Sequence, residues 1–129
     1  MRNKPSGVII LDLTPEGNKL LKILDKDELD AVLILYPDTG WELDYEWLKG
    51  VLRGLIEFVD LPEVGEMWID EEGKLKGLPI NQLATTLFQI HNGPYDVIVG
   101  TAVIMLDPAF VPPEEVSNWI VEHTRNHTE

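Results

Sequence analysis

Short apolar runs rich in Val, Ile and Leu recur along the chain, and such runs predict buried β-strands. Turn-forming groups separate them, for example Pro37-Asp38-Thr39-Gly40, in which proline and glycine favour a reversal. Gly100 interrupts the last run and predicts a bulge or a tight turn there. The predicted strands are 7–13, 31–36, 41–43, 55–61, 66–70 and 97–106.

Two central segments place apolar residues at helical spacing directly after a capping residue, which predicts two helices. Asp44 caps a helix at 45–53, and Gly54 ends it, since glycine is the usual residue after a helix. Asn81 caps a second helix at 82–90.

Two further helices are expected nearer the ends of the sequence. Glu114 opens an amphipathic segment, and Thr14 followed by Pro15 and Glu16 is typical of a helix start. Apolar residues at 20–24 fit a strand as well as a helix, and both alternatives stay open. The pattern lacks the regular alternation of a doubly wound fold. It predicts an α+β fold with a mainly antiparallel sheet of five to six strands and three to four helices, in a single domain over 1–129.

Composition narrows the class of protein. The chain has 129 residues, no cysteine and a net charge of −13. Without cysteine it has no disulfide and no thiolate chemistry, and no run approaches the roughly 18 apolar residues of a membrane span. Contact with a phosphate backbone needs clustered Lys and Arg, which an acidic chain with scattered cations lacks. We therefore expect a cytoplasmic protein with no membrane contact and no direct nucleic-acid binding.

Patterns for catalysis and metal binding are sparse. Ser6 and Ser117 lie outside any nucleophile-elbow sequence. His123 and His127 are four residues apart, but no glutamate follows the first of them. The acidic cluster at 25–30 lacks the glycine and the distal glutamate of a calcium loop. The sequence predicts no catalytic residue, no metal and no cofactor.

Acidic residues concentrate between residues 25 and 72, a stretch that holds fifteen Asp and Glu against three Lys and Arg. The same stretch contains three tryptophans. Trp47 and Trp68 are expected in the core, whereas Trp41, beside the turn, is expected to be exposed. Acidic groups with embedded aromatic residues are typical of a surface that binds a basic protein. The candidate partner-binding surface consists of Asp38, Trp41, Glu42, Asp44 and Glu46.

Three segments carry a family resemblance: GLIEFV at 54–59, DEEGKLKGLPIN at 70–81 with Ala84-Thr85 following, and DVIVGTA at 96–102. They resemble a family of small proteins of unassigned function, common in bacteriophages and in mobile regions of bacterial genomes, notably of actinobacteria. The resemblance covers about residues 31–106. It implies an accessory protein that binds a host protein or sequesters a small molecule, and it supplies no established catalytic residue.

The resembling segments also suggest a second candidate site. Gly77-Leu78-Pro79 turns the chain toward the helix that Asn81 caps, and a helix N-terminus offers free N–H groups to an anion. Asn81, Asp96 and Gly100 are therefore candidates for ligand binding. The alternative is purely structural: Asn81 caps the helix, Gly100 permits a bulge and Asp96 fixes the start of a strand.

Three functions follow in order of preference. The first is a phage-type accessory protein that engages or inhibits a basic host protein through the acidic surface, in the cytoplasm of the host cell. The second is a protein that binds or sequesters a nucleotide-like small molecule near 77–81 and 96–101. An enzyme of unknown reaction ranks third. Exposed strand edges and tryptophans also leave a homodimer open.

Overall fold

The structure, a computed structural model, describes residues 3–13, 19–62, 64–94 and 96–109, together with Asn118 and Glu122. Its elements, in chain order, are β1 Gly7–Leu13, β2 Lys19–Ile23, α1 Lys26–Val32, β3 Leu33–Tyr36, β4 Gly40–Leu43, α2 Tyr45–Leu52, β5 Ile56–Leu61, β6 Gly65–Asp70, α3 Gln82–Asn92 and β7 Ala102–Leu106.

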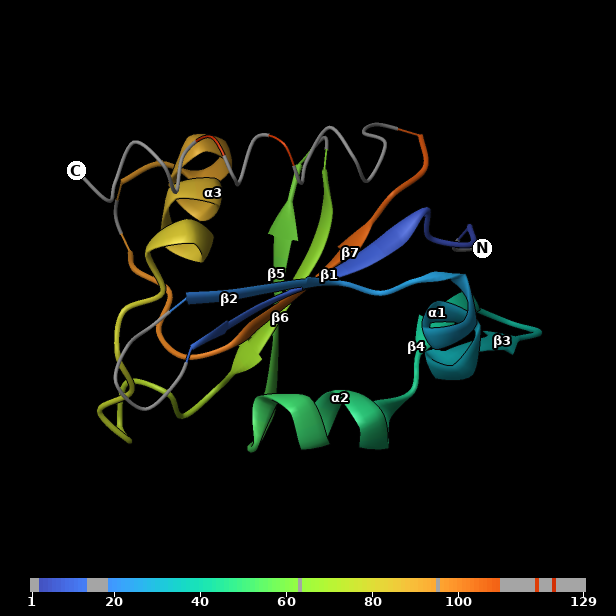
Figure 1. Ribbon diagram of the computed structural model, residues 1–129, viewed down its shortest axis with the longest axis horizontal. Coiled ribbons are helices and arrows are strands. Elements are labelled where there is room, and N and C mark those ends of the chain that lie inside the picture. Colours follow the sequence, from blue (N-terminus) through green and yellow to red (C-terminus); the bar gives the residue numbers. More distant parts are fainter. Residues whose placement is uncertain are drawn as a thin grey trace.

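Five strands form a central sheet in the order β2-β1-β7-β6-β5, and β3 pairs with β4 in a separate hairpin (Figure 1). Every pair of neighbouring strands in both sheets is antiparallel. The described residues thus contain three helices and an antiparallel sheet, which confirms the predicted α+β fold.

Helices cover both faces of the central sheet. α3 packs on one face through Leu83, Ala84 and Leu87. α2 packs on the opposite face through Leu48 and Leu52, and residues of α1 and of the β3–β4 hairpin join the same core cluster. Figure 1 shows α3 and α2 on opposite sides of the sheet.

The central strand β7 explains why the sequence carries an unbroken apolar run there. Ala102, Ile104 and Leu106 contact the core on the α3 face, whereas Val103 and Met105 contact the core on the α2 face. All five residues are buried, because a strand that is covered on both faces has no solvent side.

The segment after Pro15 had two open alternatives, a helix and a strand at 20–24. Residues 19–23 form β2, which pairs with β1, so the alternative of a strand at 20–24 is the correct one. The helix α1 begins later, after Asp25. The Asp25 carboxylate accepts a hydrogen bond from the Glu28 N–H, and the Glu28 carboxylate accepts one from the Asp25 N–H. This capping box fixes the start of α1, and residues 14–18 lie outside the described residues.

Two other boundaries differ from the prediction. Residues 31 and 32 still belong to α1, so β3 begins at Leu33. The helix α2 ends at a residue in the left-handed conformation, but that residue is Arg53, with φ 62°, and not Gly54. Gly54 is needed for space, because a Cβ atom there would lie 2.6 Å from the Asp70 carboxylate.

The strand predicted at 97–106 forms only in its second part. Within 97–99 only Val99 makes a bridge, to Ile80. The Ile98 N–H donates to the Thr85 hydroxyl at 2.9 Å, and the hydroxyl donates to the Ile98 carbonyl at 3.1 Å. A helix side chain therefore takes the hydrogen bonds that a neighbouring strand would make, and Gly100, with φ 75°, then turns the chain into β7.

The predicted last helix and the pair His123 and His127 lie outside the described residues, except that Asn118 and Glu122 are both helical. In the described part of the chain, no helix combines the length and the apolar composition that a membrane crossing requires.

Candidate binding site

The predicted acidic surface lies on one continuous stretch, the β3–β4 turn, β4 and the start of α2. Asp38 is exposed in the turn, and Glu46 is exposed in the first turn of α2. Glu42, on β4, accepts a hydrogen bond from the Thr39 hydroxyl at 2.8 Å. Asp44 has a structural role, because its carboxylate caps α2 by accepting hydrogen bonds from the Glu46 and Trp47 N–H groups. These carboxylates follow one another from the turn through β4 into α2, because α2 follows the hairpin directly.

Trp41 does not stand out as an exposed residue. It is half-buried, as are Trp47 and Trp68, and all three pack against the core cluster on the α2 face. The Lys4 ammonium lies 5.2 Å from the centre of a Trp41 ring, within the range of a cation–π contact. Trp47 and Trp68 pack against the core as expected but are only partly buried, and Trp41 is partly buried too, because the hairpin places it against the same core cluster.

A cavity of about 290 Å³ opens beside these carboxylates, between the hairpin, α2 and the central sheet. We call it the aromatic groove; it is lined by Tyr36, Glu42, Leu43, Tyr45, Leu48, Ile56 and Trp68. Tyr36 is 43% exposed and Tyr45 54% exposed. In the part of the chain that the structure describes, no lysine or arginine lines the groove. Among the described residues, the buried indole N–H of Trp68 has no hydrogen-bond acceptor.

The sequence pattern does not identify the two tyrosines as site residues. Tyr36 ends a predicted strand and Tyr45 begins a predicted helix, so both were assigned to secondary structure rather than to a site. The signal that would have found them is their position, since the two tyrosines flank the acidic segment 38–44 on both sides.

Asn81 and Gly100, two of the three candidates for ligand binding, are buried inside the fold. Asn81 is 1% exposed, and its amide donates to the carbonyls of Leu11 and Gly100, both at 2.9 Å. Its side-chain oxygen accepts from the Ala84 N–H at 3.1 Å. A Cβ atom on Gly100 would lie 2.7 Å from the Leu78 side chain. These contacts hold α3, β1 and the 98–101 turn together.

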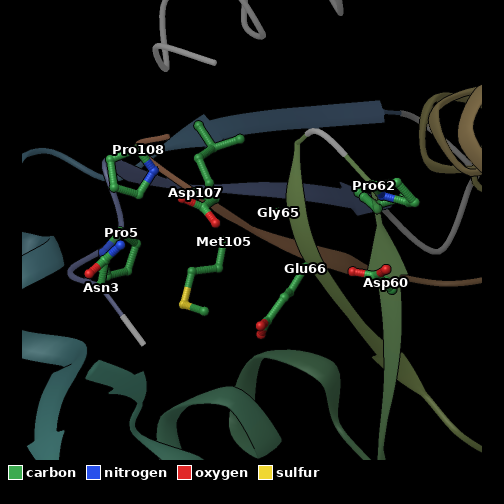
Figure 2. A pocket seen from close by; sticks show the side chains of 11 residues that line it. Asn3, Pro5, Asp60, Pro62, Gly65, Glu66, Met105, Asp107 and Pro108 are labelled. Carbon is green, nitrogen blue, oxygen red and sulfur yellow. The ribbon is translucent and has the colours of Figure 1, made fainter. Parts of the chain in front are cut away.

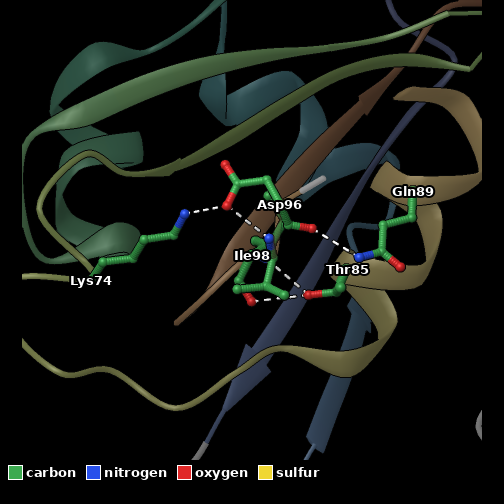
Figure 3. A network of polar contacts seen from close by, with 6 residues as sticks. Lys74, Thr85, Gln89, Asp96 and Ile98 are labelled. Carbon is green, nitrogen blue, oxygen red and sulfur yellow. Dashed lines mark hydrogen bonds and ion pairs between the residues drawn. The ribbon is translucent and has the colours of Figure 1, made fainter. Parts of the chain in front are cut away.

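Asp96 does lie at a cavity. The Lys74 ammonium pairs with its carboxylate, which also accepts from the Val97 N–H at 2.8 Å (Figure 3). The hydrogen bond from Lys74, helped by the Val97 N–H, lowers the pKa of the Asp96 carboxyl below its usual value. The Gln89 side chain donates to the Asp96 carbonyl at 2.9 Å and so ties this loop to α3.

The space beside this ion pair, which we call the Asp96 cavity, has a volume of about 360 Å³. It is lined by Glu57, Phe58, Val59, Ile69, Asp70, Glu71, Lys74, Phe88, Asp96, Val97, Ile98 and Val99. Four of these residues are acidic and one is basic. The lining therefore suits a cationic or neutral group better than a phosphate.

A third cavity, of about 370 Å³, opens at the other end of the β5–β6 hairpin (Figure 2). Its acidic residues are Asp60, Glu66 and Asp107, and Asp107 accepts from the Ala109 N–H at 2.9 Å. Gly65 lets β6 approach β7 closely, since a Cβ atom there would lie 2.0 Å from the Met105 carbonyl. In the described part of the chain, no three His, Cys, Asp or Glu side chains are grouped so that they could hold a metal ion.

Fold and site together define a small acidic α+β protein with an open aromatic groove. Residues 29–120 match the model of the DUF3846 family, a domain of unknown function. The match spans more than half of the chain, so the protein belongs to this family. This confirms the predicted resemblance to a family of unassigned function, while an origin in phages or actinobacteria stays a prediction. No match was found among curated proteins or among solved structures.

Proposed function

We propose that this protein acts by binding, and that it engages a basic protein partner through the aromatic groove and the carboxylates beside it. The observation that supports the proposal is the composition of the groove. Two exposed tyrosines and the carboxylate of Glu42 share one concave surface, and none of the described lysine or arginine residues lines it.

This combination of groups suits a lysine or arginine side chain. Aromatic faces attract cations, and tyrosine is enriched among the residues that contribute most to protein–protein binding. Asp38 and Glu46, exposed beside the groove, add negative potential that steers a basic partner toward it. The net charge of −13 also attracts a basic partner, over a longer range.

The biological role that the resemblance implies is that of a phage-type accessory factor that blocks a host protein in the host cytoplasm. It remains part of this proposal. The family match assigns no activity, so the expectation of a non-enzymatic protein also stays a prediction.

The test is an affinity pull-down from nuclease-treated lysate at low and at high salt, with two pairs of substitutions. Tyr36→Ala with Tyr45→Ala removes the aromatic walls of the groove, and Asp38→Lys with Glu46→Lys reverses the charge beside it. Asp44 is left intact, because its loss would also uncap α2. Asp27→Lys with Glu72→Lys changes the net charge equally at two exposed residues that do not line the groove.

We expect one basic protein that is captured at low salt, released at high salt, lost with both groove variants and kept with the control. If the control pair loses the partner as completely as the groove variants do, only the overall charge matters, and the groove is not the site. If no basic protein is captured at either salt concentration, the binding proposal fails.

The Asp96 cavity supports a second candidate function, the binding of a small molecule. Its volume of about 360 Å³ lies within the size range of ligand pockets. The acidic lining argues for a cationic or neutral ligand rather than the nucleotide-like one that the sequence suggested. A thermal-shift screen with nucleotides, nucleosides and polyamines separates these classes, since a ligand that binds only the folded state raises its melting temperature.

A further inference from the structure

The strand β5 lies at one edge of the central sheet and pairs with β6 alone. The backbone groups on its other side therefore define a sheet edge within the described residues. An edge of this kind is a template for a further strand, because its N–H and C=O groups are already aligned for pairing.

The hydrogen bonds show which residues present these groups. The Glu71 N–H donates to the Leu55 carbonyl at 2.8 Å. In an antiparallel pair every second residue of a strand bonds to the same neighbour, so Leu55, Glu57 and Val59 bond toward β6. The N–H and C=O groups of Ile56, Phe58 and Asp60 consequently point away from β6. The Asn92 amide confirms this direction, since it donates to the Asp60 carbonyl at 3.1 Å. Among the described residues, nothing hydrogen-bonds to the outward groups of Ile56 and Phe58.

A cavity lies against each face of this edge. On the α3 face, Glu57 and Val59 line the Asp96 cavity. On the α2 face, Ile56 and Trp68 line the aromatic groove. Phe58, 47% exposed, lies beside Trp68, with 5.2 Å between the ring centres. Side chains of a strand alternate between the two faces, so a strand added to β5 would direct successive side chains to opposite cavities.

We infer that β5 accepts an extended segment of the basic partner as a sixth strand of the sheet. The inference rests on the proposed function and specifies the form of the partner. The partner residue opposite Phe58 exchanges both backbone hydrogen bonds with it and places an apolar side chain against the Phe58 ring. The residues on either side of it face Glu57 and the Asp96 cavity, and these are lysine or arginine. The lysine or arginine that occupies the aromatic groove belongs to another part of the same partner, outside the added strand. Backbone pairing supplies affinity, and the alternating pockets supply specificity.

Charge explains why the occupant is a basic strand and not a second copy of this chain. Directly opposed side chains in adjacent strands lie about 4.5–5.5 Å apart, and like charges at that distance are destabilising. Glu57 and Asp60 lie on the edge itself, on opposite faces of the sheet, so pairing two copies of β5 would bring four carboxylates into two adjacent strands. A strand that carries lysine or arginine at alternate positions instead places its cations on the face of Glu57.

The experiment uses the whole protein and a ten-residue peptide of alternating lysine and valine, followed by fluorescence anisotropy at low ionic strength. Two N-methylated forms are compared. Methylation at the valines removes the N–H groups that face β5, and methylation at the lysines removes those that face away. We expect the first form to bind about tenfold more weakly or worse, because at least two backbone hydrogen bonds are lost, and the second to bind like the parent. Equal binding of the two forms overturns the inference.

A protein variant gives an independent readout. Phe58→Pro removes an outward N–H that the ladder with β6 does not use, and proline is tolerated at sheet edges. Phe58→Leu is its control, since it removes the ring and keeps the N–H. Loss of the peptide with Phe58→Pro and retention with Phe58→Leu support the added strand. If a basic partner is captured and depends on Tyr36 and Tyr45, yet neither Phe58→Pro nor N-methylation weakens binding, the edge inference fails while the binding function stands.

Discussion

The Asn81 side chain stabilises the fold at three places. Its side chain makes three buried hydrogen bonds, to Leu11, Gly100 and Ala84, which belong to three different parts of the chain. We predict that Asn81→Ala lowers the free energy of unfolding by about 2–4 kcal/mol, because it removes the helix cap and two buried hydrogen bonds to backbone carbonyls. Urea denaturation at pH 7 measures this loss.

Asn81→Asp separates the helix cap from the two hydrogen bonds that the Asn81 amide donates. Aspartate keeps the cap on α3 but directs a carboxylate oxygen at the Leu11 and Gly100 carbonyls, where the amide now donates at 2.9 Å. We expect a loss at least as large as that of Asn81→Ala at pH 7, and a smaller one at acid pH, where the protonated carboxyl can donate to one carbonyl. Wild-type stability for Asn81→Asp at pH 7 would contradict this assignment of the amide.

The Asp96 carboxyl offers a titration test. Its pKa is lowered by the Lys74 ammonium and the Val97 N–H, so the stabilisation exists above the ordinary pKa of aspartate and disappears as the pH falls through the lowered value. Lys74→Met is expected to raise the pKa of Asp96 toward its ordinary value, measured by NMR titration of the carboxyl carbon. Lys76→Met, which breaks the separate pair with Asp70, should leave the pKa of Asp96 unchanged.

Only part of the structural role of Asn81 could be predicted from the sequence. The capping role of Asn81 followed from the helical pattern after it and is confirmed. Its bonds to Leu11 and Gly100 did not follow, because Leu11 is seventy positions away. Because the local pattern already explains Asn81 as a helix cap, nothing in the sequence indicates that its side chain also bonds to distant residues.

At the scale of elements, the end of α2 is strained. Arg53 has a φ of 62°, in the left-handed region that side chains with a Cβ atom avoid. We predict that Arg53→Gly raises the free energy of unfolding by about 0.5–1 kcal/mol, since glycine adopts this conformation without the steric cost. Arg53→Ala is the control in the same denaturation experiment. It keeps the Cβ atom, so a gain as large as that of glycine would show that the arginine side chain, not the backbone, is the cause.

Most elements were predictable because each carried its own local signal. Asp44 before α2 and the turn at 37–39 between β3 and β4 are examples, and both lie where the pattern placed them. The segment 19–23 was ambiguous because its apolar residues suit either period. Pairing with β1 decided the outcome, and a tertiary contact of that kind overrides local preference.

At the scale of the whole molecule, the acidic half of the candidate site was visible in the composition, but the groove was not. Tyr36 and Tyr45 flank the acidic segment, whereas Ile56 and Trp68 reach the groove from β5 and β6. The packing of α2 and the hairpin on the central sheet brings these four residues together. No spacing rule in the sequence links them, so a site made of separate elements emerges only from the fold.

The net charge of −13 also makes a prediction for the whole molecule. Like charges repel in the compact state, and the screening length falls from about 30 Å at 0.01 M salt to about 8 Å at 0.15 M. We therefore expect the urea midpoint of the wild type to rise over this range of sodium chloride. Asp38→Lys with Glu46→Lys replaces two negative charges by two positive ones, which changes the net charge from −13 to −9, and should show a smaller rise.

The two effects of salt then have opposite signs, and this separates binding from folding. Salt stabilises the fold but weakens the attraction between the acidic surface and a basic partner. A partner that is released at high salt is therefore released from a protein that is more stable than before, so its loss cannot be assigned to unfolding. If the urea midpoint falls with salt instead, attractive pairs such as Lys76 with Asp70 outweigh the repulsion, and the release must be repeated with the charge variants to be assigned to the surface.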